Sequence, residues 1–368
     1  MIARNLLRRG VRTALTIVGL AVGVAAVVSL LGIAWGFERS FMAIYESKGI
    51  DLIVVKAGSG DPLTSNLDLA LIDKIKAVPG VKDAAGSLTD LVSFEEANLP
   101  RVITNGWVPG GPLFKGIRVL EGQSLKEGEP QTAILGRILA MNLKKNVGDS
   151  ITVMEEPFKV VGVFESSSPF ENGGLIVPLK TLQRLMLRNF VSGIVVSVDS
   201  TDPATIKAIG KQIERAIGGI SAAPARDFVQ GDNQIRLVNT MAWATTVIAM
   251  ILGSVGVLNT MLMTVFERTR EIGILRALGW RRNRILALIL GEAAAQGAIG
   301  STLGIGLGYL AVKAFSRSPT ASLFISSDLS PAALGLGLLM GLTLSLIGGF
   351  YPAFRASRLE PTEAIRHE

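Results

Sequence analysis

Four long apolar stretches limit what this chain can fold into. They are Ala14–Phe37, Met241–Phe266, Ile285–Val312 and Leu329–Phe354. Three of them run for 24 or 26 residues without a charge, and the remaining one carries a single carboxylate, Glu292. A helix that crosses the roughly 30 Å hydrocarbon core needs about 20 mostly apolar residues, because each residue rises about 1.5 Å. The sequence therefore predicts four membrane-spanning helices.

The composition agrees with a membrane protein that also has a substantial part in water. Charged residues make up 18% of the chain and the mean hydropathy is +0.45, whereas an ordinary soluble domain has about 25% charged residues. This balance excludes a disordered chain, a coiled coil and a purely soluble enzyme. The chain has no cysteine and only one histidine, His367, so thiolate chemistry, a zinc finger, an iron–sulfur site and a histidine-based triad are not expected.

Basic residues near the span ends predict the orientation. The segments before the first span, between the second and third, and after the fourth hold 13 basic residues against five acidic ones. Residues 38–239 hold 22 basic and 23 acidic residues. Because positive charge collects on the cytoplasmic side, we expect both termini in the cytoplasm of an inner (cytoplasmic) membrane and residues 38–239 on the periplasmic or extracellular side. The isoelectric point of about 9.7 follows from the same charges, so nucleic acid is not an expected partner.

These signals divide the chain into nine segments. We expect a cytoplasmic segment at 1–13, spans at 14–37, 240–266, 285–315 and 334–354, an extracytoplasmic domain at 38–239 and an extracytoplasmic loop at 316–333, a cytoplasmic loop at 267–284 and a cytoplasmic tail at 355–368. A cleaved signal peptide is the alternative for the first span. The apolar stretch is longer than the roughly 7–15 residues of such a peptide, and no A-x-A-like site follows it before Glu38. An uncleaved anchor is therefore favoured.

The segment between the first two spans predicts an α+β domain. Alternation and β-branched residues predict strands at 51–56, 81–91, 101–108, 132–135, 150–154, 158–165 and 193–199. Helical spacing and capping residues predict helices at 67–77, 137–143, 178–187, 202–217 and 227–239. Strands and helices alternate at both ends of the domain around a strand-rich middle. We expect an α/β layer with a β-rich insert, and the serines at 166–168 suit a flexible loop better than a nucleophile.

Small and polar residues inside the spans predict contacts between helices. Glycines at a spacing of four or nearby let another helix backbone approach closely: Gly19, Gly23, Gly253, Gly300, Gly304 and Gly308. Packing within one subunit and contact with a second subunit both remain open for them. A carboxylate inside a span usually faces a partner or a cavity. For Glu292 we expect an ion pair with Arg281, Arg282 or Arg284, and we regard a proton relay as the weaker alternative.

The loop between the second and third spans has the spacing of an amphipathic helix. Charged residues alternate with Ile272, Ile274, Leu275 and Leu278, and Gly279 is typical of a helix end. Two interpretations remain open on physical grounds: a helix that lies on lipid headgroups, or a rigid lever that fits a groove on a cytoplasmic partner.

Three motifs resemble the permeases of MacB/FtsX-type ABC transporters. They are ERTREIGILRALGWRRNRI at 267–285, YPAFRASRLEPTEAIRHE at 351–368 and ARNLLRRGVRTALTIVGLAVGVA at 3–25. PGV at 79–81, GDSITV at 148–153 and FKVVGV at 158–163 resemble the extracytoplasmic domain of that family. The order of one span, a domain of about 200 residues and three more spans also agrees. Trp280 stands where the family usually has smaller residues.

The resemblance implies a mechanism and its residues. Such permeases form dimers, and each subunit meets an ATPase through a coupling helix. The residues implied for ATPase contact in the loop are Glu267, Arg268, Arg270, Glu271, Ile272, Gly273, Arg276 and Gly279. The tail residues that would add to this contact are Pro352, Arg355, Arg358, Pro361 and Arg366.

The resemblance also implies where the energy comes from. No G-x-x-x-x-G-K-[ST] phosphate-binding loop occurs in the 368 residues, so we expect a non-catalytic subunit with no cofactor of its own, and ATP and Mg on a separate ABC ATPase. A homodimer is expected, a heterodimer is the alternative, and a periplasmic adaptor is an optional further partner.

The expected function is a permease subunit that exports or extracts a hydrophobic or amphipathic substrate by mechanotransmission, which means that ATPase closure moves the extracytoplasmic domain. One alternative is an envelope sensor or regulator whose ATPase-driven motion gates a partner enzyme or kinase. A second is a secondary transporter driven by protons through Glu292, which four spans without an inverted repeat support weakly.

Overall fold

The computed structural model describes residues 10–59, 64–323 and 330–360 and divides the chain into two compact units. Unit 1 contains residues 1–34, 239–314 and 327–368, and unit 2 contains residues 35–238 and 315–326. The predicted tail residues Pro361 and Arg366 lie outside the described residues. The helices α2 and α9 contribute residues to both units.

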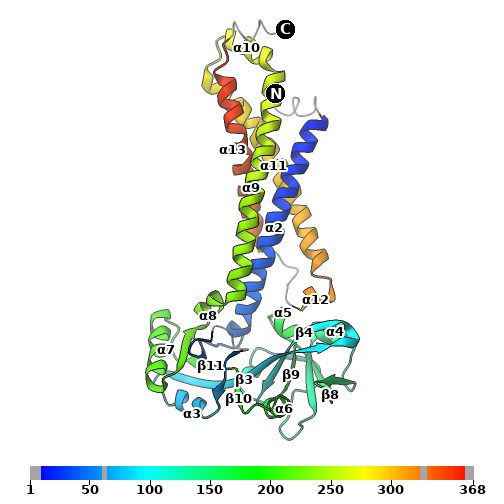
Figure 1. Cartoon of the computed structure of the whole chain (residues 1–368), viewed down its shortest axis with the longest axis vertical. Helices are drawn as coiled ribbons and strands as arrows, with labels where there is room; N and C mark the ends of the chain where they lie inside the picture. The colour runs from blue at the N-terminus through cyan, green and yellow to red at the C-terminus, as the bar shows by residue number, and fades with distance from the viewer. Residues whose placement is uncertain (1–9, 60–63, 324–329, 361–368) are drawn as a thin grey trace. The chain divides into compact units, whose positions relative to one another are not determined.

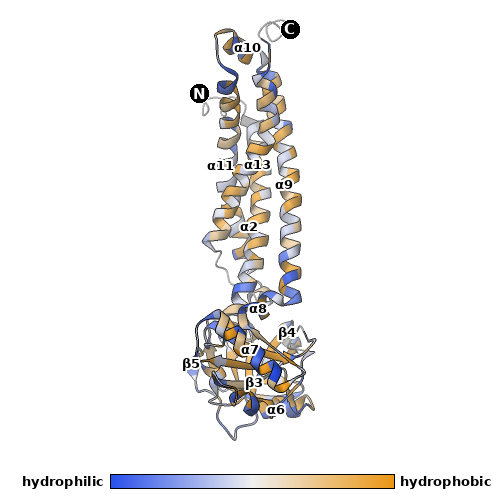
Figure 2. Cartoon of the chain, turned by 90° about the vertical axis from the view of Figure 1, so that its left-hand side faces the viewer, coloured by the Kyte–Doolittle hydropathy of each residue, from blue (hydrophilic) through white to orange (hydrophobic). Residues whose placement is uncertain are grey.

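Unit 1 is built from long apolar helices. Within the described part of the chain, four helices are long and apolar enough to cross a membrane, which confirms the predicted membrane architecture. They are α2 (Gly10–Glu46), α9 (Asn233–Glu267), α11 (Arg282–Phe315) and α13 (Pro331–Ser357). Each predicted span lies inside one of these helices, and each helix continues beyond it. Apolar residues run along α9, α11 and α13 in the hydropathy view (Figure 2).

Glycines on α11 allow close packing against α2. A Cβ atom added at Gly304 would lie 2.7 Å from the Cβ of Val24, and one at Gly300 would lie 2.8 Å from the Cβ of Leu20. The same face includes Gly308, where an added Cβ would lie 3.2 Å from the Cβ of Val28. These distances are shorter than ordinary van der Waals contact, so only glycine permits this helix separation.

The other predicted glycines behave differently from one another. Gly253 on α9 packs against Leu344 on α13, at 2.9 Å from an added Cβ. At Gly19 and Gly23, no described atom outside the neighbouring backbone of α2 lies within 4 Å of an added Cβ, so these two glycines make no close helix contact in the described part of the chain. The reason is geometric: neighbouring helix residues point about 100° apart, and the face of α2 that packs on α11 carries Leu20 and Val24 instead.

Unit 2 contains a ten-stranded mixed sheet and a separate two-stranded sheet (Figure 1). The order in the large sheet is β12-β1-β11-β3-β4-β9-β6-β8-β5, with β7 paired to β8. Its strands are β1 (Leu52–Lys56), β3 (Val81–Phe94), β4 (Leu99–Trp107), β5 (Arg118–Gly122), β6 (Thr132–Gly136), β7 (Ser150–Val153), β8 (Glu156–Glu165), β9 (Leu175–Pro178), β11 (Gly193–Val198) and β12 (Ile220–Pro224). The small sheet pairs β2 (Leu67–Asp68) with β10 (Phe190–Val191).

Short helices surround these strands. They are α3 (Leu71–Lys76), α4 (Arg137–Leu143), α5 (Pro169–Asn172), α6 (Leu179–Leu185), α7 (Pro203–Ile217), α8 (Ala225–Gly231) and α12 (Pro319–Ser322), together with the 3₁₀ turns η2 (Glu95–Ala97) and η3 (Pro112–Phe114). The predicted α+β class is confirmed. The strand-rich middle does not form a separate layer, because β3 pairs with β11 through residues 81–87 and with β4 through residues 88–94.

The sheet has two faces with different cores. Side chains alternate across a strand, so Leu52 and Val54 enter one buried cluster while Ile53 and Val55 enter another. The first cluster is covered by helices of the domain, including α3, α6 and α7. The second is covered by the last turns of α2 and by α8, through residues such as Tyr45.

Two predicted helices differ from the structure. The helix expected at 67–77 is confined to α3, because residues 67–68 pair with β10 instead. The helix expected at 227–239 is interrupted by Asp232, which has an extended backbone. Its carboxylate accepts hydrogen bonds from the backbone N–H groups of Gln234 (2.8 Å) and Ile235 (3.1 Å). Asp232 therefore begins α9 as an N-terminal cap.

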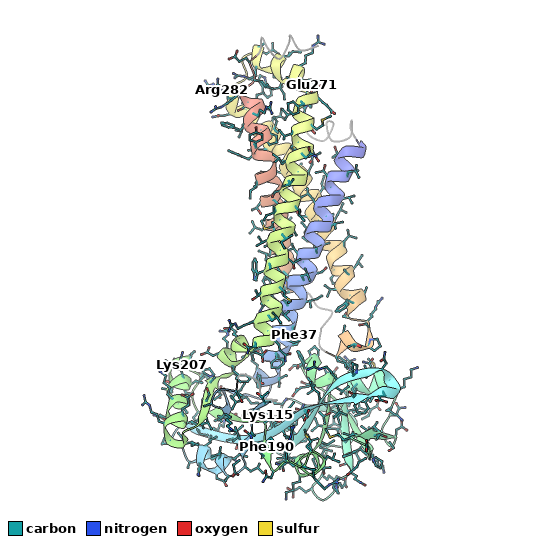
Figure 3. The ribbon with its side chains drawn as sticks, viewed as in Figure 1. Phe37, Lys115, Phe190, Lys207, Glu271 and Arg282 are labelled. Atoms are coloured by element: carbon teal, nitrogen blue, oxygen red, sulfur yellow. The ribbon has the colours of Figure 1, made fainter. Side chains whose placement is uncertain are left out.

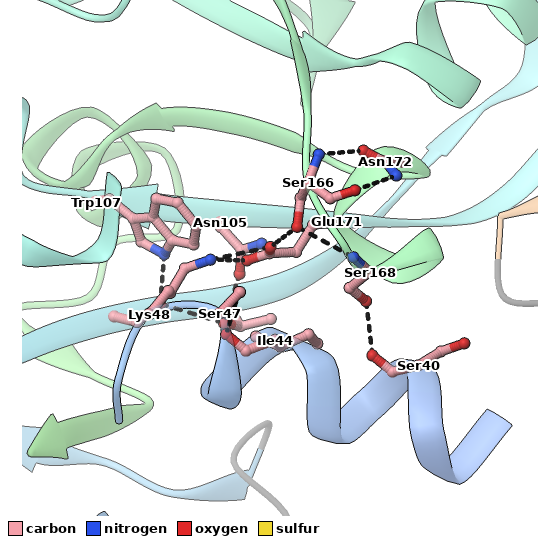
Figure 4. Close-up of polar contacts among 12 residues, drawn as sticks. Ser40, Ile44, Ser47, Lys48, Asn105, Trp107, Ser166, Ser168, Glu171 and Asn172 are labelled. Atoms are coloured by element: carbon pink, nitrogen blue, oxygen red, sulfur yellow. Dashed lines mark hydrogen bonds and ion pairs between the residues drawn. The ribbon is translucent and has the colours of Figure 1, made fainter. Parts of the chain in front are cut away.

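A buried ion pair holds the end of α2 to the domain (Figure 4). The Nζ of Lys48 donates to both carboxylate oxygens of Glu171, at 2.7 and 2.9 Å, and their side chains are 1% and 3% exposed. The hydroxyl of Ser166 donates to the same carboxylate, and the hydroxyl of Ser168 donates to the carbonyl of Ser40 at 2.7 Å. Of the three serines expected in a flexible loop, Ser166 and Ser168 are thus buried and hydrogen-bonded, whereas Ser167 is exposed.

The segment after α11 also joins the domain core. Leu323 is 2% exposed and packs beside Gly173, whose added Cβ would lie 2.7 Å from the Cα of Leu323. The side-chain amide of Asn142 donates to the carbonyl of Pro319 at 3.0 Å and to the hydroxyl of Ser322 at 3.2 Å. The described first part of the loop between the third and fourth spans, residues 316–323, therefore belongs to unit 2.

Replacing Gly304 by alanine tests the packing of α11 on α2. The added Cβ forces Val24 and the backbone of Ala21 to move, so Gly304→Ala should destabilise the chain by about 1–3 kcal/mol and lower its thermal unfolding midpoint. Gly306 is the matched control, because nothing lies within 4 Å of its added Cβ. Gly306→Ala should leave the midpoint unchanged or raise it, and equal losses in both variants would contradict this packing.

Replacing Lys48 alone should cost more than replacing the whole ion pair. Lys48→Met leaves the buried carboxylate of Glu171 uncompensated, which costs about 3–5 kcal/mol, whereas Lys48→Met/Glu171→Leu removes both charges and should recover much of that loss. Thermal unfolding of the purified variants measures the difference. The exposed pair of Arg184 and Glu156 is the control: Arg184→Met should change the midpoint little. A double variant less stable than Lys48→Met would contradict the assignment.

Candidate functional site

The loop between the second and third spans folds into a short separate helix. The helix α10 (Thr269–Ala277) follows directly on α9, and the break between them lies at Arg268. Gly279 ends the helix with a φ of +87°, a conformation that glycine adopts without strain. The chain then turns into α11 at Arg282 (Figure 3). The predicted amphipathic helix is therefore present between two spans.

One face of α10 packs into the helix bundle. Ile272 is 3% exposed and belongs to a buried cluster with Ile285 and Ile289 of α11 and Ala353 of α13. Gly273 is buried beside it. Ile272 and Gly273 were predicted to contact an ATPase, and the structure places them inward instead, because an amphipathic helix buries its apolar stripe.

A buried ion pair fixes the start of α10. One guanidinium nitrogen of Arg268 donates to both oxygens of Glu292 at 2.9 Å, and the Nε donates to Glu271 at 2.9 Å. The side chains of Arg268 and Glu292 are 14% and 6% exposed. Burial lowers the pKa of the guanidinium, but these hydrogen bonds outweigh burial and raise it, so Arg268 stays charged.

Among the described residues, Glu292 is therefore paired with Arg268 and not with Arg281, Arg282 or Arg284. These three arginines precede Glu292 by eight to eleven residues, which corresponds to roughly 12–16 Å along a helix axis. Arg268 comes from the end of the neighbouring helix α9 and approaches Glu292 from the side. Arg268 was also predicted to contact the ATPase, and its burial assigns it to the bundle.

Near the end of α10, a second arginine, Arg276, is also turned away from the open face of the helix. Arg276 donates from one terminal nitrogen to the carbonyl of Trp280 at 3.0 Å. Its Nε is buried and has no hydrogen-bond partner among the described residues. Arg276 thus holds the turn that carries Trp280 and Gly279, and it does not lie on the open face of the helix.

The other face of α10 is open. Glu267, Arg270, Glu271 and Gly279, all predicted contact residues, are exposed. Two apolar side chains that were not predicted as contacts share this face: Ile274 is 45% exposed and Leu278 is 73% exposed. Arg270, Ile274 and Leu278 follow one another at a spacing of four, which places them on one side of the helix. An alternating pattern identified them only as apolar, so their outward direction could not be recognised.

The predicted contact residues of the tail also divide into buried and exposed ones. Pro352 is buried inside α13, so it shapes the bundle and is not available to a partner. Arg355 and Arg358 are exposed and lie over aromatic rings, at 4.8 Å from the ring centroid of Phe266 and 4.2 Å from that of Phe354. Contacts of this kind hold a guanidinium in place. Among the described residues, no group of three His, Cys, Asp or Glu side chains is placed to hold a metal ion.

Two family matches cover most of the chain. Residues 13–216 match the MacB-like periplasmic core domain, a range that exceeds half of the 368 residues, and residues 243–361 match the FtsX-like permease C-terminal region. The second match contains α10 and the whole of α11 and α13.

Several curated relatives match almost the whole length of this chain. The macrolide export ATP-binding/permease protein MacB of Nitrobacter winogradskyi is 32% identical over 96% of this chain and 58% of its own length. The pyoverdine export ATP-binding/permease protein PvdT of Pseudomonas fluorescens is 29% identical over 97% of this chain and 57% of its own length. The chain thus spans less than two thirds of the length of these relatives.

Solved structures also resemble part of the chain. The periplasmic region of MacB from Actinobacillus actinomycetemcomitans is 15% identical, with a TM-score of 0.39, over 50% of this chain and 93% of that one. The length of the match to the periplasmic core domain, together with four membrane-spanning helices and an α+β domain between the first two, decides the family. The chain belongs to the ABC transporter permeases that have a MacB-like periplasmic core domain and an FtsX-like C-terminal region.

Proposed function

We propose that this chain is the permease subunit of an ABC transporter that converts ATP hydrolysis on an ATPase subunit into movement of its extracytoplasmic domain. The movement would export or extract a hydrophobic or amphipathic substrate. The observation that carries the proposal is α10, a helix between two spans with one face fixed to the bundle and the other face open. A surface that must bind a partner and transmit force needs both properties.

The contacts of α10 suggest the path of the force. The ATPase would press on the open face formed by Arg270, Ile274 and Leu278. Ile272 and the pair of Arg268 and Glu292 would pass this displacement to α11 and to the end of α9. Because α9 is one continuous helix from Asn233 to Glu267, a shift at its inner end would reach residues that belong to the domain.

The partners follow from the same proposal. ATP and Mg would bind the ATPase, since the 368 residues contain no phosphate-binding loop, and a second copy of the permease would complete the transporter. The open glycine face of α2, with Gly19 and Gly23, is suited to close approach by another helix. We place the chain in the inner membrane with both termini in the cytoplasm, because the excess basic residues lie at one set of span ends. A periplasmic adaptor is a further partner to test.

Replacing Leu278 by aspartate tests the open face of α10. The change removes about 2 kcal/mol of apolar burial and places a carboxylate in the contact, so at least tenfold less ATPase should co-purify with the permease, since about 1.4 kcal/mol corresponds to a factor of ten. Leu187 is the matched control, because it is a 94% exposed leucine in the domain. Leu187→Asp should retain the ATPase. Undiminished recovery with Leu278→Asp would count against this role of α10.

Replacing Glu292 by glutamine tests transmission separately from binding. The open face of α10 remains, so the ATPase should still bind within about twofold, but the start of α10 loses its buried charge partner. The chain has no cysteine, so a single cysteine at exposed Lys211 allows a spin label on each copy of a dimer. ATP should change the distance between the two labels in the wild type and change it much less in Glu292→Gln.

The control for this measurement is Glu156→Gln. Glu156 pairs with Arg184 in the domain, away from α10, and the Arg184 side chain is 54% exposed, so loss of this carboxylate should have little effect. Full ATP-driven movement in Glu292→Gln would show that the pair does not transmit force. Movement with no cargo transport in reconstituted vesicles would favour the sensor alternative, and transport without ATP would favour a secondary transporter.

A further inference from the structure

One face of the domain sheet is left partly uncovered and forms an open cavity of about 400 Å³. Its residues come from the last turns of α2, from β1, β3, β4 and β11, from α5 and from the start of α9. The lining residues of β4 are Arg101, Ile103, Asn105 and Trp107, which alternate with residues that face the opposite core. The volume lies within the range of about 300–1,000 Å³ that is usual for small-molecule sites.

One wall of the cavity is aromatic. Phe37 and Phe41 on α2 are only half-buried, and the ring of Phe170 meets them edge-on at 4.9 and 5.0 Å between centroids (Figure 3 labels Phe37). Tyr45 and Trp107 extend this wall toward the sheet. Half-buried rings at an open cavity retain apolar surface that a bound molecule would remove from water.

The floor of the cavity carries small polar groups that are already hydrogen-bonded. The hydroxyl of Thr89 donates to the side-chain oxygen of Asn105 at 2.8 Å, and the indole N–H of Trp107 donates to the hydroxyl of Ser87 at 2.9 Å. The backbone N–H of Thr89 donates to the hydroxyl of Ser192 at 3.1 Å. These groups keep the floor in a fixed geometry.

The charged side chains that line the cavity differ in whether they have a partner. Lys48 and Glu171 neutralise each other, and Asp232 is occupied by the backbone at the start of α9. Arg101 is exposed and forms no ion pair with any carboxylate of the described residues. The carboxylate of Asp232 is buried, so the exposed charged group that this cavity offers to a ligand is the guanidinium of Arg101, in the same lining as the aromatic wall.

We propose that the cavity binds an anionic amphiphile, a molecule with one apolar chain or body and a carboxylate or phosphate head. The apolar part would lie along Phe37, Phe41 and Phe170, and the head would meet the guanidinium of Arg101. A guanidinium recognises carboxylate and phosphate alike through paired hydrogen bonds. The volume lies near the lower end of the range for such sites, which favours a single chain. This inference goes beyond the coupling proposal, because binding requires no ATPase.

Quenching of Trp107 fluorescence tests the site in the full chain. The chain has four tryptophans, and replacing Trp35, Trp243 and Trp280 by phenylalanine leaves Trp107 as the sole reporter. The protein is placed in nanodiscs of zwitterionic lipid and titrated with dodecanoate that carries bromine on its chain. Saturable quenching is expected, with at least tenfold weaker binding of dodecyltrimethylammonium that carries the same brominated chain.

Three variants assign the interaction to the two parts of the cavity. Arg101→Ala should weaken dodecanoate binding at least tenfold, whereas Arg101→Lys should stay within about threefold of the wild type. Lys159→Ala is the matched control, because Lys159 is an exposed cation on β8 away from the cavity, and it should change nothing. Ile103→Phe adds volume inside the cavity and should weaken both probes.

Three results would overturn the proposal. They are an absence of saturable quenching, equal affinity for the anionic and cationic probes, and equal effects of Arg101→Ala and Lys159→Ala. None of them depends on ATP or on α10, so they would leave the coupling proposal untouched. Conversely, undiminished ATPase recovery with Leu278→Asp, which would count against the coupling proposal, would say nothing against the cavity.

Discussion

A charge that is removed from water needs a partner of opposite sign, because its desolvation costs several kcal/mol. Two buried ion pairs meet this requirement, and each one holds the residue just beyond the end of a long helix in place. Lys48 follows the end of α2 by two residues and is held by Glu171, and Arg268 follows the end of α9 directly and is held by Glu292. The first pair positions one wall of the domain cavity. The second positions α10, so both candidate sites depend on buried ion pairs.

The features that could be predicted from the sequence are those with a local pattern. Apolar length predicted the four spans, and runs of β-branched residues predicted strands such as β1 and β11, because each run is complete within five or six residues. The ion pairs had no such signal. Lys48 and Glu171 are 123 residues apart, and Arg268 and Glu292 are 24 apart. A local search offered Glu292 the arginines at the start of its own helix or just before it, whereas the partner follows the end of α9.

The motif of the loop between the second and third spans shows a second limit of sequence-based prediction, which concerns the direction of side chains. A resemblance groups Arg268, Arg270, Ile272 and Leu278 in one segment, but it does not say which way each side chain points. Only packing decides this, because Ile272 is buried with residues of α11 and α13 while Leu278 is 73% exposed. The inward residues of such a motif are then explained by folding, and the outward ones are left for recognition. Burial therefore separates two roles that sequence similarity combines.

The cavity and the proposed force path share helices, and this has a thermodynamic consequence. Phe37 and Phe41 on α2 form the aromatic wall, and Asp232 and Gln234 at the start of α9 complete the lining. If ATPase closure shifts either helix against the sheet, the cavity changes shape, and its affinity for an amphiphile changes with it. Linkage makes this relation reciprocal, so a bound amphiphile favours the state that binds it better, by the same free energy. An apolar cavity at the ends of α2 and α9 would therefore let the substrate side of the membrane influence the ATPase side without a separate signalling element.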